Sequence, residues 1–242
     1  MSAPTVREIL HKSSAFLAER GVDSPALSAQ LLLGHALGLT RLDLLLQSDR
    51  PLGEAELAAA RELIRRRGRG EPAAYILGEK EFYGLAFAVS PATLIPRPET
   101  EHLVEEAEAR FVRDAALAFA DLGTGSGCLA VALAVRFAQA RGLAVDLSAA
   151  ALAVARSNAA RHGVEGRLDF RQGDFADLAG LGVPGGSLDL VAANPPYVSE
   201  AEYAEVSPEV RDYEPRAALT PGPSGLEAIQ ALAPGARQAL KP

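Results

Sequence analysis

The pattern of apolar positions divides the chain into a helical first third and a remainder of alternating elements. Over residues 1–75, apolar side chains such as Val6 and Ile9 recur at intervals of three or four, which is the spacing of one face of an α-helix. Gly21 and Pro25 interrupt the pattern and mark the end of one helix and the start of the next. The pattern predicts a small helical domain over residues 1–75 that carries no constellation of catalytic residues.

Residues 76–98 change to a pattern typical of extended chain. Aromatic and β-branched residues such as Phe82 favour strands, and Gly84 can turn a hairpin. Prolines on either side of Arg97 disfavour a helix there. We predict a β-hairpin linker followed by a stiff Pro-Arg-Pro segment, in which Arg97 orders the linker or pairs with Glu99 at the surface.

From residue 99 onward, a helical stretch is followed by apolar runs that alternate with glycine turns and further helical stretches. Runs of this kind are typical of strands buried in a parallel sheet, and their alternation with helices indicates an α/β domain over residues 99–242. The expected strands lie within residues 117–120, 142–147, 166–175 and 187–193.

Composition excludes several classes of protein. The 242 residues, 48% of them hydrophobic, can form one large domain or a small domain joined to a medium one. No apolar run approaches the roughly 20 residues that span a bilayer, and charges interrupt the N-terminal stretch where a signal peptide would be apolar. A single cysteine, Cys128, excludes an internal disulfide, and four scattered histidines give no zinc site. We expect a cytoplasmic protein without membrane contact or structural metal.

Charge is distributed unevenly along the chain. Residues 1–75 carry ten Lys or Arg against nine Asp or Glu, whereas residues 76–242 carry 14 against 22. The acidic part would repel a nucleic-acid backbone, so direct DNA binding is not expected. The one basic cluster, Arg65 to Arg69, is interpreted as a solvated last helical turn that complements the helix dipole. A docking patch for an acidic partner is the alternative.

A glycine-rich turn, "DLGTGSG" at residues 121–127, follows the first expected strand. Each glycine lets the backbone approach a ligand, and the following helix directs its N-terminal amides toward the same place. Asp146 closes the next strand, 19 residues beyond Gly127, near the spacing at which an acidic residue meets ribose hydroxyls in nucleotide-binding βαβ units. The alternative for Asp146 is a helix N-cap, aided by Ser148, and the two roles are compatible.

The G-x-G-x-G spacing of this turn resembles the nucleotide loop of S-adenosylmethionine-dependent methyltransferases. The resemblance implies a Rossmann-like fold with S-adenosylmethionine as methyl donor and S-adenosylhomocysteine as product. Asp174 and Phe175 end the third expected strand, where such enzymes contact the adenine. The residues expected to contact the donor are Phe82, Asp121, Gly123, Thr124, Gly125, Gly127, Asp146, Asp174, Phe175 and Asn194.

The motif "NPPY" follows the fourth expected strand. A residue before proline is pushed toward extended dihedral angles, so the motif is rigid before substrate arrives. Because neither proline has an N–H, the side-chain oxygen of Asn194 and the carbonyl of Pro195 stand as two acceptors, which match a planar NH2 group on adenine, cytosine or a carboxamide. The ring of Tyr197 or Phe82 is expected near the positive charge of the donor. The residues expected to carry catalysis are Asn194, Pro195, Pro196 and Tyr197.

Four stretches in this order, behind a helical N-terminal domain, closely resemble the PrmC/HemK family of protein-(glutamine-N5) methyltransferases: "FYG" at 82–84, "LIPRPETE" at 94–101, "DLGTGSG" at 121–127 and "NPPY" at 194–197. The resemblance implies methylation of the glutamine in the Gly-Gly-Gln motif of class 1 peptide chain release factors. It also implies a helical domain over residues 1–75 that helps recognise the release factor, a hairpin linker over 76–98 and a Rossmann-like catalytic domain over 99–242. We expect a monomer.

Two further expectations concern the end of the chain. Residues 198–225 are proline-rich and suit a substrate-contacting loop that orders on binding. The family continues into further strands beyond "ALKP", so we expect a fragment or an incomplete sheet whose unpaired edge costs stability and donor binding.

Three other functions remain open from the residues. A ribosomal-protein glutamine methyltransferase would use the same chemistry, and only "LIPRPETE" favours the release factor over it. A DNA adenine-N6 methyltransferase would need a basic cleft, which the charge balance opposes. A non-catalytic S-adenosylmethionine-binding protein would retain the loop without transfer.

Overall fold

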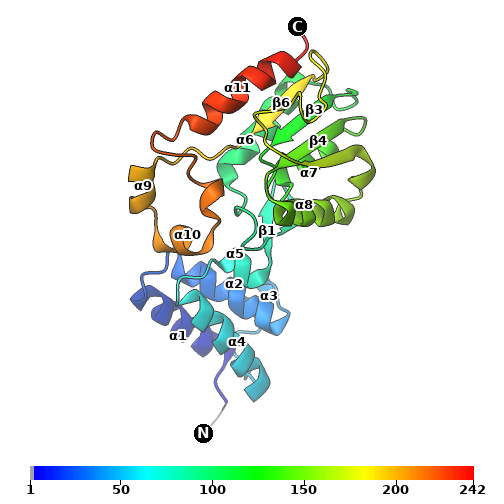
Figure 1. The fold of residues 1–242 in the computed structure, drawn as a ribbon. Helices are drawn as coiled ribbons and strands as arrows, with labels where there is room; N and C mark the ends of the chain where they lie inside the picture. The colour runs from blue at the N-terminus through cyan, green and yellow to red at the C-terminus, as the bar shows by residue number, and fades with distance from the viewer. Residues whose placement is uncertain (1–2) are drawn as a thin grey trace. The chain divides into compact units, whose positions relative to one another are not determined.

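The computed structural model describes residues 3–242, and these form two compact units, one that ends at Gly78 and one that spans Glu79–Pro242 (Figure 1). The first unit is helical throughout its described part, and the second unit holds the sheet. Each unit has hydrophobic clusters of its own.

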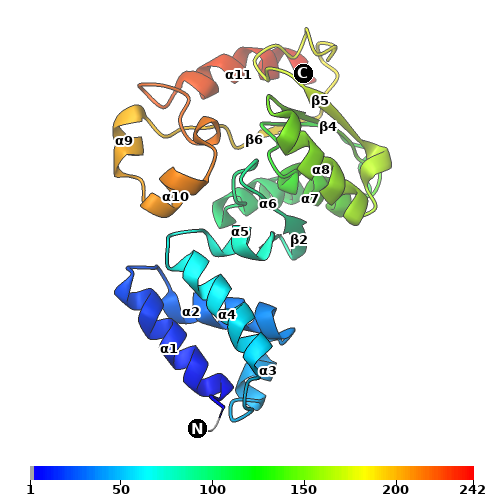
Figure 2. The same ribbon diagram turned by 60° about the horizontal axis from the view of Figure 1, so that its bottom comes forward.

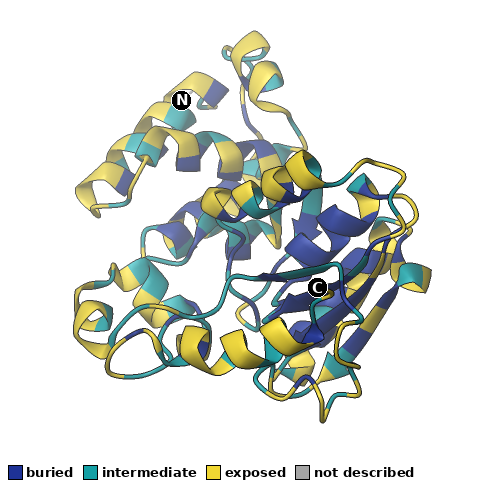
Figure 3. Ribbon diagram, turned by 90° about the horizontal axis from the view of Figure 1, so that it is seen from above, coloured by how far each residue is buried: buried dark blue, intermediate teal, exposed yellow. Residues whose placement is uncertain are grey.

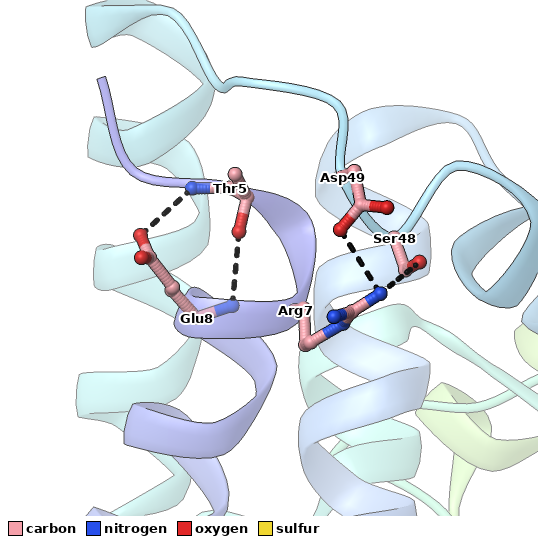
Figure 4. A network of polar contacts seen from close by, with 5 residues as sticks. All are labelled: Thr5, Arg7, Glu8, Ser48 and Asp49. Atoms are coloured by element: carbon pink, nitrogen blue, oxygen red, sulfur yellow. Dashed lines mark hydrogen bonds and ion pairs between the residues drawn. The ribbon is translucent and has the colours of Figure 1, made fainter. Parts of the chain in front are cut away.

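The first unit contains five α-helices within residues 3–78. Thr5 and Glu8 form a capping box at its start: the Glu8 amide donates to Thr5 Oγ1 (3.4 Å) and the Thr5 amide donates to Glu8 Oε2 (3.1 Å) (Figure 4). Arg7 contacts Ser48 and Asp49 (3.1 and 2.9 Å), so the first helix is tied to the turn after the third. The helices are α1 (Val6–Glu19), α2 (Pro25–Leu37), α3 (Arg41–Leu46), α4 (Glu54–Arg67) and α5 (Ala73–Leu77).

The basic cluster ends α4, as predicted, and Arg65 and Arg69 are exposed, but not all of the cluster is solvated. Arg66 makes a bidentate ion pair with the Glu71 carboxylate (2.8 and 2.5 Å). Arg67 is only 4% exposed and donates to the Glu71 carbonyl (3.0 Å). Arg65 pairs with Glu62 (2.7 Å). The predicted solvated turn is therefore wrong for Arg67, because contacts inside the helical unit engage its guanidinium.

The second unit is built on a sheet of four parallel strands within residues 79–242, in the order β5-β4-β3-β6. The chain moves outward from β3 to β4 and β5, and then crosses to the other side of β3 to form β6. This reversal is the topological switch point at which α/β sheets bind ligands. All four expected strands are confirmed, as β3 (Ala118–Leu122), β4 (Arg141–Asp146), β5 (Leu168–Gln172) and β6 (Leu190–Ala193).

Helices cover both faces of this sheet, because side chains of β3 that point to opposite faces pack into two different hydrophobic cores. Phe119 joins a core that contains residues of three helices, whereas Ala120 and Leu122 join a second core that contains Ala239. The first core is supplied by α6 (Glu101–Arg110), α7 (Cys128–Arg136) and α8 (Ala149–Arg161), and the second by α11 (Glu227–Ala239). Figure 2 shows α7 and α8 on one side of the strands and α11 on the other. The strands are accordingly among the most buried parts of the unit, as their dark blue colour in Figure 3 shows.

The predicted hairpin is confirmed as β1 (Glu79–Phe82) and β2 (Leu85–Ala88), paired antiparallel. Tyr83 and Gly84 form its two-residue turn and both have positive φ (51° and 74°), as the twist of a tight hairpin requires. Asn158 of α8 holds the end of β2, because it accepts from the Ala88 amide (2.8 Å) and donates to the Ala88 carbonyl (3.0 Å).

The segment expected to be a loop, residues 198–225, contains two short helices, α9 (Glu200–Glu205) and α10 (Pro208–Tyr213). Ser199 and Glu202 form a capping box at the start of α9, and Pro208 opens α10. Of the residues the structure describes, none lies in a helix long and apolar enough to cross a membrane.

Candidate active site

A cavity of about 580 Å³ lies within the second unit, at the carboxyl ends of the strands. Its volume falls within the range of about 300–1,000 Å³ that is usual for small-molecule sites. The residues that line it include residues 92–97, Thr100, Asp121, residues 123–126, Asp146, Leu147, Asp174, Phe175, Asn194, Pro196, Pro215, Ala217, Ala218 and Pro221.

The glycine-rich turn forms one wall of the cavity. Gly123 and Gly125 have φ of 78° and 55°, and a Cβ atom at either would meet nothing within 4 Å. The amides of Gly123 and Thr124 both donate to the Val145 carbonyl (2.9 Å each), which ties the turn to β4. The turn therefore presents open backbone to the cavity.

Asp146 holds the same turn from the neighbouring strand. Its Oδ2 accepts from the Gly125 amide (2.8 Å) and its Oδ1 accepts from the Ser148 amide (2.9 Å). Ser148 itself caps α8 by accepting from the Ala151 amide (3.1 Å). Each carboxylate oxygen of Asp146 has accepted one hydrogen bond, so lone pairs remain for a hydroxyl in the cavity.

Gly127 has a different role from the one predicted. It does not line the cavity. It precedes α7 with φ of 79°, and a Cβ atom there would lie 2.9 Å from the Cβ of Ala155. The prediction that Gly127 contacts the donor is corrected: the glycine allows α7 and α8 to approach each other.

Asp121 is the last residue but one of β3, lines the cavity and is only 1% exposed. The pKa of this carboxyl is raised to about 6, chiefly by burial and to a small extent by the charge of Asp146, while hydrogen bonds from Thr124 Oγ1 (2.6 Å) and the Ala130 amide (3.1 Å) oppose the shift. A positively charged ligand in the cavity would favour the ionised form of Asp121.

Asp174 and Phe175 line the cavity in the turn that follows β5, which ends at Gln172. Their contact with the adenine stays a prediction. Asp174 Oδ1 accepts from the Ala176 amide (2.9 Å), which fixes the carboxylate in a turn. Phe175 is half-buried and packs against the core on the α11 side of the sheet. The cavity wall thus holds a hydrogen-bond acceptor, the Asp174 carboxylate, next in sequence to the apolar ring of Phe175.

Asn194 lines both the large cavity and a small neighbouring groove. It lines the large cavity together with Pro196, and it also lines a small groove of about 40 Å³ together with Pro195 and Tyr197. Its Nδ2 donates to Thr100 Oγ1 (3.0 Å). The bond leaves the side-chain oxygen of Asn194 without a partner among residues 3–242.

The two aromatic rings expected near the donor lie in contrasting places. Phe82 is 1% exposed, sits in the core and packs edge-on against Phe87 with ring centroids 6.1 Å apart. The prediction that Phe82 contacts the donor is corrected, because other core side chains surround the ring. Tyr197 is 60% exposed and lines the groove rather than the cavity.

Arg97 pairs with Glu214 rather than with Glu99. Its Nη2 lies 2.6 Å from Glu214 Oε1, and the Ile95 amide donates to Glu214 Oε2 (3.1 Å). The Glu214 side chain is 1% exposed. Since Pro215 follows it directly and lines the cavity, this pair anchors the segment 198–225 as a wall that is already folded.

Sequence reasoning missed Thr100 and Glu214 as members of the site. Thr100 lies inside "LIPRPETE", which was recognised only as a family motif, and Glu214 lies in a stretch read as a loop. Thr100 contacts Asn194 across 94 positions of sequence, and Glu214 contacts Arg97 across 117. The motif "LIPRPETE" was the one feature of the sequence that could have pointed to Thr100.

Comparisons with known proteins agree with this geometry. The model of the PrmC N-terminal domain matches residues 8–78, and the model of a methyltransferase domain matches residues 119–213. The release factor glutamine methyltransferase of Nitratidesulfovibrio vulgaris is 52% identical over 241 residues, which cover 100% of this chain and 80% of that protein. The chain belongs to the release factor glutamine methyltransferase family.

Other members of the release factor glutamine methyltransferase family align in the same way. The protein of that name from Chlorobaculum tepidum is 47% identical over 98% of this chain and 82% of its own length. The one from Geobacter sulfurreducens is 44% identical over 98% of this chain and 81% of its own length. The resemblance stated from the motifs is confirmed by matches that span nearly the whole sequence.

Proposed function

We propose that this protein transfers a methyl group from S-adenosylmethionine to the side-chain amide nitrogen (N5) of the glutamine in the Gly-Gly-Gln motif of class 1 peptide chain release factors. The observation that carries the proposal is the identity of 44–52%, along almost the whole chain, with proteins named as release factor glutamine methyltransferases. The position of Asn194 between cavity and groove gives the proposal a mechanism.

The residues around the large cavity fit the methyl donor. Asp146 offers lone pairs to ribose hydroxyls, Asp174 offers an acceptor to the adenine amino group, and Phe175 offers an apolar surface to the ring. Gly123, Thr124 and Gly125 leave open backbone for the methionine portion. When bound, S-adenosylmethionine supplies a methyl group on a positively charged sulfur, which a nitrogen lone pair can attack.

The small groove fits the glutamine side chain. Its lining is mostly apolar, from Leu94, Pro195, Tyr197, Val198 and Leu219, and this suits an aliphatic stem. At the inner end, the Asn194 oxygen and the Pro195 carbonyl accept from the two hydrogens of the amide NH2. The two prolines fix this pair before substrate binds, so positioning does most of the catalytic work.

The groove provides no dedicated base. Among the described residues that line it, none is a carboxylate or an imidazole, and the Arg97 guanidinium is paired with Glu214. An amide nitrogen that has gained a methyl group is strongly acidic while it retains both hydrogens. The proton is therefore lost to water after the attack, and the acceptors at Asn194 and Pro195 hold the departing hydrogen until then.

Labelled methyl donor tests the choice of substrate. We expect transfer to a class 1 release factor, and no transfer when the motif glutamine is replaced by alanine. Transfer to a ribosomal protein or to duplex DNA would instead support one of the alternative methyltransferases. Donor binding by calorimetry without transfer to any of the three would support a binding protein.

We also infer that the protein acts as a monomer in the cytoplasm and binds no DNA directly. The support is the substrate class, which acts in translation, and the excess of acidic residues, 22 against 14 basic ones, over residues 76–242. Size-exclusion chromatography with light scattering tests the monomer, and retention on duplex DNA at low salt would contradict the last inference.

A further inference from the structure

Asn194 has a partner outside its own motif. The amide Nδ2 donates to the hydroxyl of Thr100 over 3.0 Å, across 94 positions of sequence. Thr100 is 7% exposed and lines the cavity. Among residues 3–242, Thr100 is the one hydrogen-bond partner of the Asn194 side chain, and it comes from "LIPRPETE" rather than from "NPPY".

The side-chain orientation of Asn194 needs such a partner. The prolines of the motif fix the backbone, but the terminal torsion of an asparagine is broad and roughly two-fold. In one orientation the oxygen of Asn194 faces the substrate NH2. In the other, the NH2 of Asn194 faces it, and two groups of donors oppose each other. The chemistry proposed above requires the first orientation.

Thr100 is itself held in a fixed place. It ends the 3-10 turn Pro98–Thr100, and its amide donates to the Arg97 carbonyl (3.1 Å). The helix α6 begins at the next residue, and its Val104 is fully buried. Because a β-branched side chain has few χ1 rotamers, the hydroxyl has little freedom to move.

We propose that Thr100 is a positioning residue for methyl transfer: its hydroxyl engages the NH2 of Asn194 and so presents the Asn194 oxygen to the glutamine amide. This inference rests on the proposed function. It assigns a physical task to part of "LIPRPETE", namely to hold the side-chain amide of Asn194, whose torsions the prolines of "NPPY" do not fix.

Two substitutions at this position separate orientation from packing. Thr100→Val keeps the branched shape and removes the hydroxyl, whereas Thr100→Ser keeps the hydroxyl. With the full chain and a release factor, we expect Thr100→Val to lower kcat about 10- to 100-fold, and Thr100→Ser to restore it to within about threefold of wild type. The dissociation constant of the donor should stay within about threefold in both variants, because the hydroxyl that is removed binds Asn194.

Ser187→Ala serves as the control. The Ser187 hydroxyl donates to the Pro184 carbonyl (2.7 Å) in the same unit, and the residue lines neither the cavity nor the groove. We expect this control to keep kcat within about twofold of wild type. A loss of activity equal to that of Thr100→Val would point to general loosening of the unit and would overturn the proposal.

A double variant gives the sharpest readout. If Thr100 acts through Asn194, then Thr100→Val should have no further effect on kcat when Asn194→Ala is already present. Full additivity of the two effects would overturn the inference, as would wild-type kcat in Thr100→Val. If the wild-type protein methylates no release factor, both the proposed function and this inference are wrong. If the wild-type protein methylates a release factor and Thr100→Val does so at the same rate, the proposed function stands and this inference is wrong.

Discussion

The ion pair of Arg97 and Glu214 should be the main anchor of the cavity wall formed by residues 198–225. The Glu214 carboxylate is 1% exposed and accepts from both the Arg97 guanidinium (2.6 Å) and the Ile95 amide (3.1 Å). Arg97→Met keeps most of the side-chain volume but removes the charge. Among the described residues, the buried carboxylate then keeps the Ile95 amide as its donor.

The expected loss in the free energy of unfolding follows from how deeply each side chain of the pair is buried. Removal of one partner from a fully buried pair costs about 3–5 kcal/mol. Here the Arg97 side chain is 32% exposed, so water screens part of the interaction, and we expect about 2–3 kcal/mol. For a unit of this size the loss corresponds to a fall of about 4–12 °C in melting temperature. Glu214→Gln should cost about 1 kcal/mol, because the exposed side of Arg97 can be hydrated.

A double-mutant cycle on the full chain measures the pair directly. The free energy of unfolding is determined by urea denaturation for Arg97→Met, Glu214→Gln, the double variant and wild type. Because the double variant buries no charge, we expect it to lose at least about 1 kcal/mol less than the sum of the single losses. Donor affinity should fall with the single variants, since Pro215 follows Glu214 at the cavity wall.

Arg211→Met is the control on the same segment. Arg211 and Asp212 form a pair whose side chains are 42% and 52% exposed, and such surface pairs contribute about 0–1 kcal/mol. If Arg97→Met costs no more than this control, or if the effects in the cycle simply add, then the buried pair does not anchor the wall and the reasoning is refuted.

Three further predictions concern single positions. Gly127→Ala should lower the free energy of unfolding by about 1–2 kcal/mol more than Gly123→Ala, because both strain a positive φ but only the former meets Ala155; equal losses in urea would contradict this. The raised pKa of Asp121, about 6 against 3.8, means that its contribution to stability is full below pH 3.8 and is lost as pH rises through about 6. Asp121→Asn should remove this part of the pH dependence, about 3 kcal/mol between pH 4 and 7 by denaturation, and an unchanged profile would speak against burial as the cause. Phe82→Leu should cost about 1–2 kcal/mol in stability and leave the donor dissociation constant within about twofold, whereas a large loss of donor affinity would restore a contact with the donor.

The fold of the second unit was largely predictable because its signals are local. A strand buried on both faces is a continuous apolar run, as in β3 and β4. The edge strand β5 instead alternates, with Leu168 and Phe170 buried and Asp169 exposed. The hairpin was predictable because Gly84 can supply a positive φ at its turn.

The acidic residues of the site were predictable for a geometric reason. Asp121, Asp146 and Asp174 each follow or end a strand, and the carboxyl ends of parallel strands share one edge of the sheet. Strand prediction alone therefore brought them to one cavity, and Asn194 joined them by the same rule.

The remainder depends on packing between distant segments. No local pattern tells that the ring of Phe82 enters the core or that Gly127 faces Ala155, since both residues also suit a ligand site. The bonds of Thr100 to Asn194 and of Arg97 to Glu214 join segments about a hundred positions apart, 94 and 117. A single sequence carries no signal for such pairs, although it marked one of the segments as a motif.

Single-turnover methyl transfer by Asn194→Ala tests the central claim most directly. The claim is that the Asn194 oxygen and the Pro195 carbonyl hold the glutamine NH2 in place for attack. With a release factor as substrate, we expect the rate to fall at least about 100-fold, because one of two preorganised acceptors is lost, while the donor dissociation constant measured by calorimetry stays within about threefold of wild type. A rate within a few-fold of wild type would show that the amide is positioned by other groups, and it would contradict the account.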